Sequence, residues 1–149
     1  MRAVVQRVRA CAVHVDGVLK GKIDDGLLVY LGVGRTDAER DARTLCDKIV
    51  NLRIFTDENG KMNLSVRDVG KALLVVSQFT LFGDARDGRR PSYTEAAEPA
   101  AARILYETAL RILQGSGLTV AAGEFQASME VSYTNMGPVT ILLDTEKRF

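Results

Sequence analysis

The sequence predicts an α+β fold: a single compact domain with a mixed or antiparallel, barrel-like sheet and two main helices. Two helical patterns stand among many short strand patterns, several of which are joined by hairpin turns. The chain has 149 residues, 46% hydrophobic and 26% charged, which is close to the globular average. About 150 residues is the usual size of one domain, and no linker, repeat or low-complexity tract divides this chain. We therefore expect residues 1–149 to form one domain.

The first elements are predicted to be strands. Residues 3–9 and 11–15 alternate apolar and polar side chains, which is the period of a half-buried strand. Asp16-Gly17 is a strong turn signal, and Val18–Ile23 follows as the returning strand. Gly26–Val33 is a continuous apolar run, which is typical of a strand buried on both faces.

The middle of the chain predicts a helix over residues 37–52 and another buried strand. Thr36 and Glu39 form a capping-box pattern at the start of this helix, and apolar residues follow at helical spacing. Asp57–Gly60 is predicted to be a turn, because its Asn-Gly pair tolerates positive φ values. Ala72–Val76 is the second buried strand.

The last third predicts a second helix and late strands. Pro99 suits the first turn of the helix, Gly115 or Gly117 ends it, and its apolar stripe includes Ile104 and Leu113. The expected strands are Leu118–Ala122, Met129–Tyr133 and Val139–Leu143, the last two joined by a turn over 134–138.

The composition excludes several kinds of site. The sole histidine, His14, cannot supply paired zinc ligands, and its place in an alternating strand favours a strand-face residue over a catalytic base. Cys11 and Cys46 are too few for a structural zinc site of Cys and His alone. A formal charge of +1 argues against binding nucleic acid by bulk electrostatics, although a local basic patch remains open. We expect no metal and no cofactor.

The same composition bears on location. Arg2, Arg7 and Arg9 interrupt every apolar run at the N-terminus, so no secretory signal pattern is present. The longest apolar block, residues 26–34, is far shorter than the roughly 20 residues that span a bilayer. Two cysteines without secretory context indicate free thiols. We therefore expect a cytoplasmic protein with no membrane partner.

Three segments could carry chemistry, and each has two interpretations. Ser77-Gln78-Phe79-Thr80 follows a buried strand, where it forms either a binding site or an ordinary strand end. Gly137-Pro138 is either a simple turn or a rigid unit that presents backbone carbonyls to a ligand. The loop 83–93 carries three arginines and two aspartates, and it is either solvated or in contact with phosphates.

At these motifs the chain resembles the D-aminoacyl-tRNA deacylases, also called D-tyrosyl-tRNA deacylases. The resemblance runs from end to end, and SQFT at 77–80 with GPVT at 137–140 are the paired signatures of that family. The matching segments are MRAVVQRV at 1–8, NLRIF at 51–55, KMNLSV at 61–66, VVSQFTL at 75–81, GRRPSY at 88–93 and NMGPVT at 135–140.

The resemblance implies a homodimer with active sites at the dimer interface. It also implies a carboxylic ester hydrolase that acts on the 3′-terminal aminoacyl-adenosine of aminoacyl-tRNA. The products would be a free D-amino acid and tRNA, and glycine mischarged on tRNA(Ala) would also be removed. L-amino acids would be rejected by a cis Gly137-Pro138 peptide that reaches into the partner's site, so that selection works by excluding the L side chain.

The resemblance further implies roles for single residues. Backbone N–H groups around Phe79 and Thr80 would stabilise an oxyanion, and the 2′-hydroxyl of the substrate would take part in activating water. Thr80 is either a nucleophile or a positioning group. The implied catalytic segment is Ser77, Gln78, Phe79 and Thr80, and the implied substrate-binding residues are Gly137, Pro138, Arg7, Phe125 and Met129.

Other implied details concern the surroundings of these motifs. Arg7 would hold the Gly137-Pro138 carbonyls by hydrogen bonds, and Arg89 and Arg90 would lie near the end of the tRNA. The chain departs from the family's usual pattern at Met136, where relatives carry an acidic residue, and at Cys11-Ala12, where an Ala-Ser pair is usual.

Two alternatives stay open at this point. One is a module that binds tRNA or a small ligand but has lost the reaction, and the other is a metal-dependent hydrolase. The presence of both SQFT and GPVT favours the enzyme, because a pure binding protein has little need for both.

Overall fold

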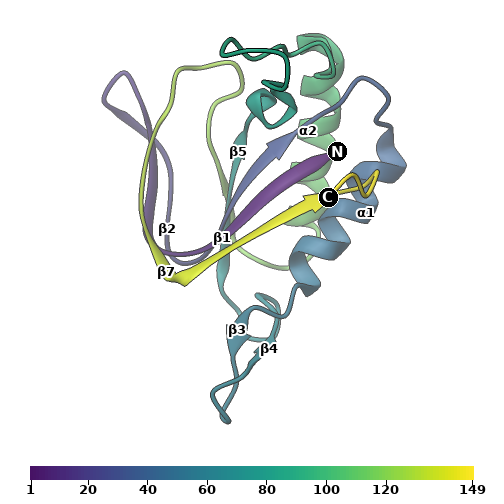
Figure 1. Cartoon of the computed structure of the whole chain (residues 1–149). Coiled ribbons are helices and arrows are strands. Elements are labelled where there is room, and N and C mark those ends of the chain that lie inside the picture. Colours follow the sequence, from purple (N-terminus) through teal and green to yellow (C-terminus); the bar gives the residue numbers. More distant parts are fainter.

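Five strands form one mixed sheet in the computed structural model, which describes residues 1–149. The strand order is β6-β5-β2-β1-β7, and the two helices pack against one face of the sheet (Figure 1). The sheet strands are β1 (Arg2–Val15), β2 (Val18–Gly32), β5 (Ala72–Ser77), β6 (Val120–Ala122) and β7 (Glu130–Asp144). The predicted α+β class with a mixed sheet and two helices is confirmed. The sheet curves but is not closed into a barrel, because β6 and β7 remain its two edges.

The first two strands form a long antiparallel hairpin. The turn is Asp16-Gly17, and both residues have positive φ values, 50° and 76°, as a two-residue hairpin turn requires. The two strands predicted over Val18–Ile23 and Gly26–Val33 are in fact one strand, β2, because β1 is long enough to pair with both segments.

The middle strand β2 is buried on both faces, as its apolar run predicts. Leu27, Val29 and Leu31 share a core with residues of both helices. Leu28 faces the opposite side, where a smaller core includes Leu74 of β5. Burial of each aliphatic side chain contributes roughly 1.5–3 kcal/mol to the stability of the fold. β2 therefore stabilises the packing on both faces of the sheet.

The first helix, α1 (Glu39–Asn51), begins later than predicted, and the predicted Thr36 cap is wrong. The N-cap is Ala38, and its N–H donates to the Asp41 carboxylate at 2.9 Å. The Thr36 hydroxyl instead donates to Glu146 at 2.9 Å.

The delayed start of α1 has a physical cause in Asp37. Its carboxylate accepts a hydrogen bond from the Gly34 N–H at 2.5 Å and forms an ion pair with the α-ammonium of Met1 at 2.5 Å. These contacts hold residues 34–37 in a turn before the helix. They also place the N-terminus, where β1 begins, beside this turn.

The second helix, α2 (Pro99–Gln114), has Pro99 at its first turn and Gly115 as its C-cap, as predicted. Ala109 and Leu113 of the predicted stripe are buried, but Ile104 is 65% exposed and the stripe missed the buried Tyr106. The spacing of 106, 109 and 113 is helical, so Tyr106 continues the same buried stripe by one turn toward the start of the helix.

The two late strands predicted over 129–133 and 139–143 are one strand, β7, and the predicted turn between them is a bulge. Pairing with β1 continues on both sides of the bulge, through Val8↔Asn135 and Gln6↔Thr140. Arg7 alone therefore lies opposite residues 136–139, and β7 bends sharply here (Figure 1).

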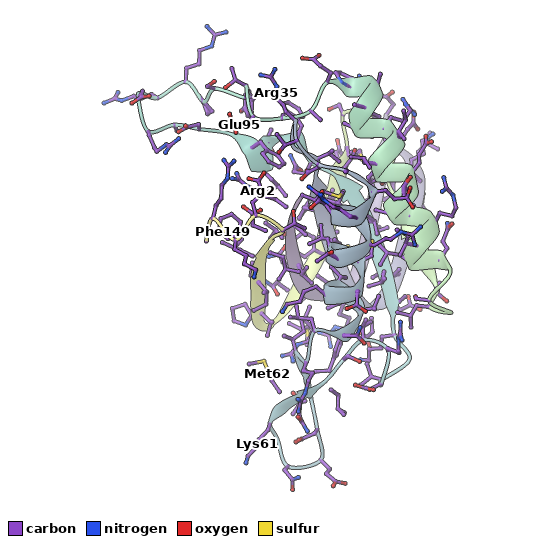
Figure 2. The ribbon with its side chains drawn as sticks, turned by 90° about the vertical axis from the view of Figure 1, so that its right-hand side faces the viewer. Arg2, Arg35, Lys61, Met62, Glu95 and Phe149 are labelled. Atoms are coloured by element: carbon purple, nitrogen blue, oxygen red, sulfur yellow. The ribbon has the colours of Figure 1, made fainter.

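A small hairpin of β3 (Phe55–Thr56) and β4 (Met62–Leu64) projects from the body of the protein. Lys61 and Met62 lie toward its tip (Figure 2). The predicted turn is confirmed, with Gly60 at φ 76° and the Asp57 carboxylate accepting two backbone N–H groups at 2.9 Å. Neither α1 nor α2 has the length and apolarity that crossing a bilayer requires.

Candidate active site

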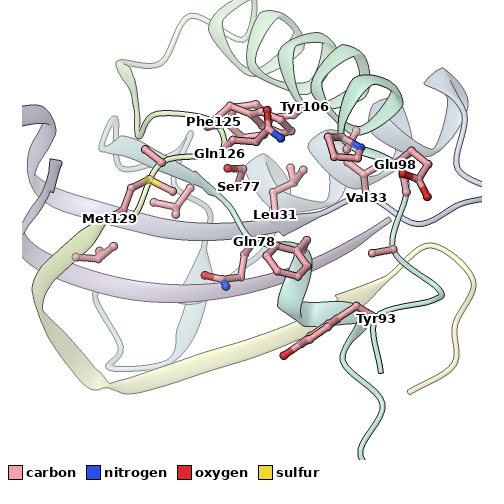
Figure 3. Close-up of a pocket in the computed structure, with 18 residues that line it drawn as sticks. Leu31, Val33, Ser77, Gln78, Tyr93, Glu98, Tyr106, Phe125, Gln126 and Met129 are labelled. Atoms are coloured by element: carbon pink, nitrogen blue, oxygen red, sulfur yellow. The ribbon is translucent and has the colours of Figure 1, made fainter. Parts of the chain in front are cut away.

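A cavity of about 640 Å³ opens at the carboxyl end of β5, between α2 and the segment after β6. Its volume lies within the roughly 300–1,000 Å³ usual for small-molecule sites. Most of its lining is apolar, with Phe125 and Tyr106 below α2, Met129 toward one end and Glu98 toward the other (Figure 3).

The floor of the cavity is the end of β5 and the start of a short 3-10 helix, η1 (Phe79–Phe82). The Gln78 N–H still donates to the Leu31 carbonyl of β2 at 2.9 Å, so the floor is tied to the sheet. Leu81 is the first residue of η1 whose N–H finds a carbonyl of the same turn. The N–H groups of Phe79 and Thr80 are therefore free within the helix, as at any helix start.

Thr80 lies beside the cavity and does not line it. Its hydroxyl oxygen accepts a hydrogen bond from the Gln78 amide at 2.5 Å, and no ionisable side chain hydrogen-bonds to it. A serine or threonine nucleophile needs a base to take its proton. The geometry therefore indicates that the Thr80 hydroxyl oxygen is a hydrogen-bond acceptor that orients the Gln78 side chain.

The apolar wall is built by α2 and the segment that follows β6. The rings of Tyr106 and Phe125 lie 5.6 Å apart, and Arg103 covers Phe125 from outside, 4.6 Å from the ring centroid. Burial raises the pKa of Tyr106 to about 12, so its neutral hydroxyl donates to the Val75 carbonyl at 3.1 Å. This tyrosine supports the wall and is not an acid or a base at neutral pH.

Met129 reaches the cavity because Gly123 has no side chain. A Cβ atom on Gly123 would lie 2.6 Å from the Met129 sulfur. Met129 and Phe125, both expected to line the pocket, are thus brought to the same cavity as Ser77, Gln78 and Phe79.

The mouth of the cavity carries two exposed aromatic rings and a basic loop. Phe79 and Tyr93 are 59% and 39% exposed, and their rings meet edge to face at 5.1 Å. Residues 84–92 form a finger closed by an Asp84↔Ser92 bridge.

The charges of this finger are unevenly paired. Hydrogen bonds from the Arg86 guanidinium hold the pKa of Asp84 well below its usual range. Arg89 and Arg90 are exposed and form no ion pair. The finger therefore offers two free guanidinium groups beside the mouth.

Gly137 and Pro138 lie outside the cavity, on the bulge of the edge strand β7, and both are exposed. The peptide bond between them is cis. Gly137 has a φ of 117°, and a Cβ atom there would lie 2.8 Å from a nitrogen of Arg7. A side chain at this position has no room.

Arg7 contacts the backbone next to this pair. Its Nε donates to the Met136 carbonyl at 3.3 Å and its Nη1 to the Ile54 carbonyl at 2.7 Å. The hydrogen bonds thus reach the carbonyl that precedes Gly137, and they do not go to the carbonyls of Gly137 and Pro138 themselves. Arg7 joins the bulge to the base of the β3–β4 hairpin.

The remaining reactive side chains lie elsewhere. Burial raises the pKa of Cys11 to about 11 and that of Cys46 to about 12, so both thiols are protonated at neutral pH. His14 lies half-buried on β1 and, like the cysteines, does not line the cavity. No group of three or more His, Cys, Asp or Glu side chains is arranged to hold a metal ion.

Two parts of the cavity were not predicted. Tyr106 and Tyr93 both line it. Tyr106 belonged to no candidate segment, and Tyr93 ends the loop 83–93, which was considered only for contact with phosphates. The helical spacing of Tyr106 with Ala109 could have indicated its burial, whereas nothing in the sequence indicates that Tyr93 returns to Phe79.

A model of the family described as D-Tyr-tRNA(Tyr) deacylase matches residues 4–144. Curated relatives named D-aminoacyl-tRNA deacylase include those of Halothermothrix orenii and Alkaliphilus metalliredigens. They are 58% and 57% identical to this chain, over 100% of both chains in each case.

Solved structures agree with these matches. The c-Myc DNA Unwinding Element Binding Protein superposes with a TM-score of 0.91 at 38% identity, covering 97% of this chain and 99% of the other. A probable eukaryotic D-amino acid tRNA deacylase superposes with a TM-score of 0.81 at 17% identity, over 95% and 97% of the two chains, which shows the shared fold. The chain belongs to the D-Tyr-tRNA(Tyr) deacylase family.

Proposed function

We propose that this protein hydrolyses the ester between a D-amino acid and the 3′-terminal adenosine of tRNA. The observation that carries the proposal is the cavity at the end of β5, where Ser77, Gln78 and Phe79 meet Phe125 and Met129. Family membership over nearly the whole chain supports the same activity. The apolar walls accept an amino-acid side chain, and the polar floor meets the ester. Because the proposed substrate is an aminoacyl-tRNA, we also propose a cytoplasmic location.

The reaction we propose needs little side-chain chemistry. Water attacks the ester carbonyl, the tetrahedral oxyanion collapses, and the 3′-oxygen of the ribose leaves with a proton. The free N–H groups of Phe79 and Thr80 are suited to stabilise the oxyanion, each worth about 2.7–4 kcal/mol. The neighbouring 2′-hydroxyl of the substrate helps to activate the water, since no histidine or thiol lines the cavity.

Selection between D- and L-amino acids requires a rigid steric barrier, which we call the wall. The proposed wall is the Gly137–Pro138 bulge of a second subunit, which would enter the mouth of the cavity and exclude an L side chain. This pair is exposed and does not line the cavity of its own chain. Glycine has no side chain to exclude, so glycine mischarged on tRNA(Ala) would also be removed.

The activity predicts release of tyrosine from D-tyrosyl-tRNA and none from L-tyrosyl-tRNA at the same enzyme concentration. Acid-precipitable radioactivity of the charged tRNA, followed over time, measures both. If D-tyrosyl-tRNA persists at micromolar enzyme, the protein is not a hydrolase of this ester, and the binding module is the interpretation that remains. Activity abolished by EDTA and restored by a divalent metal would indicate a metal-dependent hydrolase instead.

The position of Thr80 predicts that its hydroxyl is not the attacking group. Thr80→Val removes the acceptor for the Gln78 amide, so we expect kcat/KM to fall about ten-fold, which corresponds to about 1.4 kcal/mol. Removal of a nucleophile would instead lower the rate by about 10⁴-fold or more. Thr80→Ser keeps the hydroxyl and serves as the matched control, with near wild-type activity.

The proposed wall requires a homodimer. Light scattering of the purified protein should give twice the 16.3 kDa of the chain. A monomer under conditions in which the enzyme still discriminates D from L would contradict the cross-subunit wall, while leaving the hydrolysis itself intact.

The basic finger is proposed to contact phosphates near the acceptor end of the tRNA. Replacing both Arg89 and Arg90 with Ala should raise KM for D-tyrosyl-tRNA about ten-fold and reduce the slope of log KM against log salt by about one for each phosphate that the finger no longer binds. Hydrolysis of D-tyrosyl-adenosine, which has no such phosphates, should not change. Arg111→Ala, at the opposite end of α2 from the cavity, removes a positive charge away from the finger and should leave KM unchanged; each single finger variant, Arg89→Ala or Arg90→Ala, removes the same charge and is compared with it. An equal effect on both substrates would show that the finger acts on the cavity and not on the tRNA.

A further inference from the structure

The bulge of β7 is closed at its base by side chains that converge on one hydroxyl group. The Thr140 hydroxyl oxygen accepts a hydrogen bond from the Gln6 side-chain amide at 3.0 Å and another from the Asn135 side-chain amide at 3.0 Å. Asn135 and Thr140 are the residues at which pairing with β1 stops and resumes. Their side chains therefore span the bulge where the strand leaves and rejoins the sheet.

A third hydrogen bond reaches into the bulge itself. The Asn135 side-chain carbonyl accepts the Val139 N–H at 3.3 Å. Asn135 thus uses both ends of its amide, one on the backbone of the bulge and one on Thr140. We call Asn135 and Thr140, with Gln6 behind them, the clamp.

The clamp acts on a part of the chain that has little other support. Gly137 and Pro138 are exposed on an edge strand, and no core residue packs over them. Apart from the clamp, the hydrogen bond from Arg7 to the Met136 carbonyl is the side-chain contact that holds this backbone. Arg7 fixes the side of the bulge that precedes Gly137, and Asn135 fixes the side that follows Pro138.

We propose that Asn135 and Thr140 are positioning residues for the rejection of L-amino acids, acting through the placement of Gly137–Pro138. This inference rests on the proposed function, in which that pair forms the wall of the partner's cavity. A wall discriminates only if it holds its position to within about 0.5 Å. A bulge that moves would admit the L side chain while the N–H groups of Phe79 and Thr80 continued to act on the ester.

The test replaces the shared acceptor. Thr140→Val keeps the shape and strand preference of the side chain and removes the hydroxyl group. We expect the ratio of kcat/KM for D-tyrosyl-tRNA to that for L-tyrosyl-tRNA to fall about ten-fold. The change should come from faster hydrolysis of the L substrate, a readout that a general loss of stability would not produce.

Two variants serve as controls. Thr140→Ser keeps the acceptor oxygen and should retain the wild-type ratio. Thr134→Val makes the same chemical change at an exposed position of the same strand, where the hydroxyl makes no hydrogen bond, and should also retain it. Asn135→Ala provides a second route to the same effect if Thr140→Val does not fold, and thermal unfolding of each variant shows which are folded.

The outcomes separate the two proposals. A wild-type protein that spares L-tyrosyl-tRNA, together with folded Thr140→Val and Asn135→Ala proteins that spare it equally, would overturn the clamp and leave the proposed function standing. An equal loss of selectivity in Thr140→Ser would also overturn it, because the acceptor oxygen is then not the cause. A wild-type protein that hydrolyses neither substrate would remove the proposed function and the clamp together.

Discussion

The parallel ladder between β2 and β5 is the interaction on which the rest of the site depends. It runs from Gly26↔Ala72 to Leu31↔Ser77, and the Gln78 N–H extends it by one more bond to Leu31. A Cβ atom on Gly26 would lie 1.9 Å from the Ala72 carbonyl oxygen, so only glycine allows the strands to meet here. A slip of one residue would turn every side chain of β5 to the other face. The polar end of β5 lies beneath α2 because this register holds.

The chemistry that we propose follows from what the cavity lacks. Its lining is mostly apolar, the only histidine lies on another strand, and both thiols are buried and protonated. Backbone N–H groups at the start of η1 are the donors that we propose for an oxyanion. Such groups suit a reactive ester, because fixed dipoles need no reorganisation during the reaction. Their position depends on the backbone, and hence on the β2–β5 ladder.

The second half of the proposed site is also made of backbone, but it is supported differently. The wall at Gly137–Pro138 projects from an edge strand, so side-chain hydrogen bonds replace the packing that holds the floor. Floor and proposed wall lie in different parts of one chain, since Gly137 and Pro138 do not line the cavity. In the dimer that we propose, a second subunit would bring them together.

The sequence by itself determined the elements whose cause is local. The Asp16-Gly17 turn, the doubly buried run of β2 and Pro99 at the start of α2 follow from residue chemistry and periodicity, and the SQFT and GPVT segments identified the family. Only the tertiary structure decided what depends on partners far along the chain. β1 made one strand out of two predicted segments of β7 and turned the predicted turn into a bulge. Asp37, held by Met1, moved the start of α1 away from Thr36. Hydrogen bonds between distant segments leave no periodic trace in the sequence, because either partner alone fits many other surroundings.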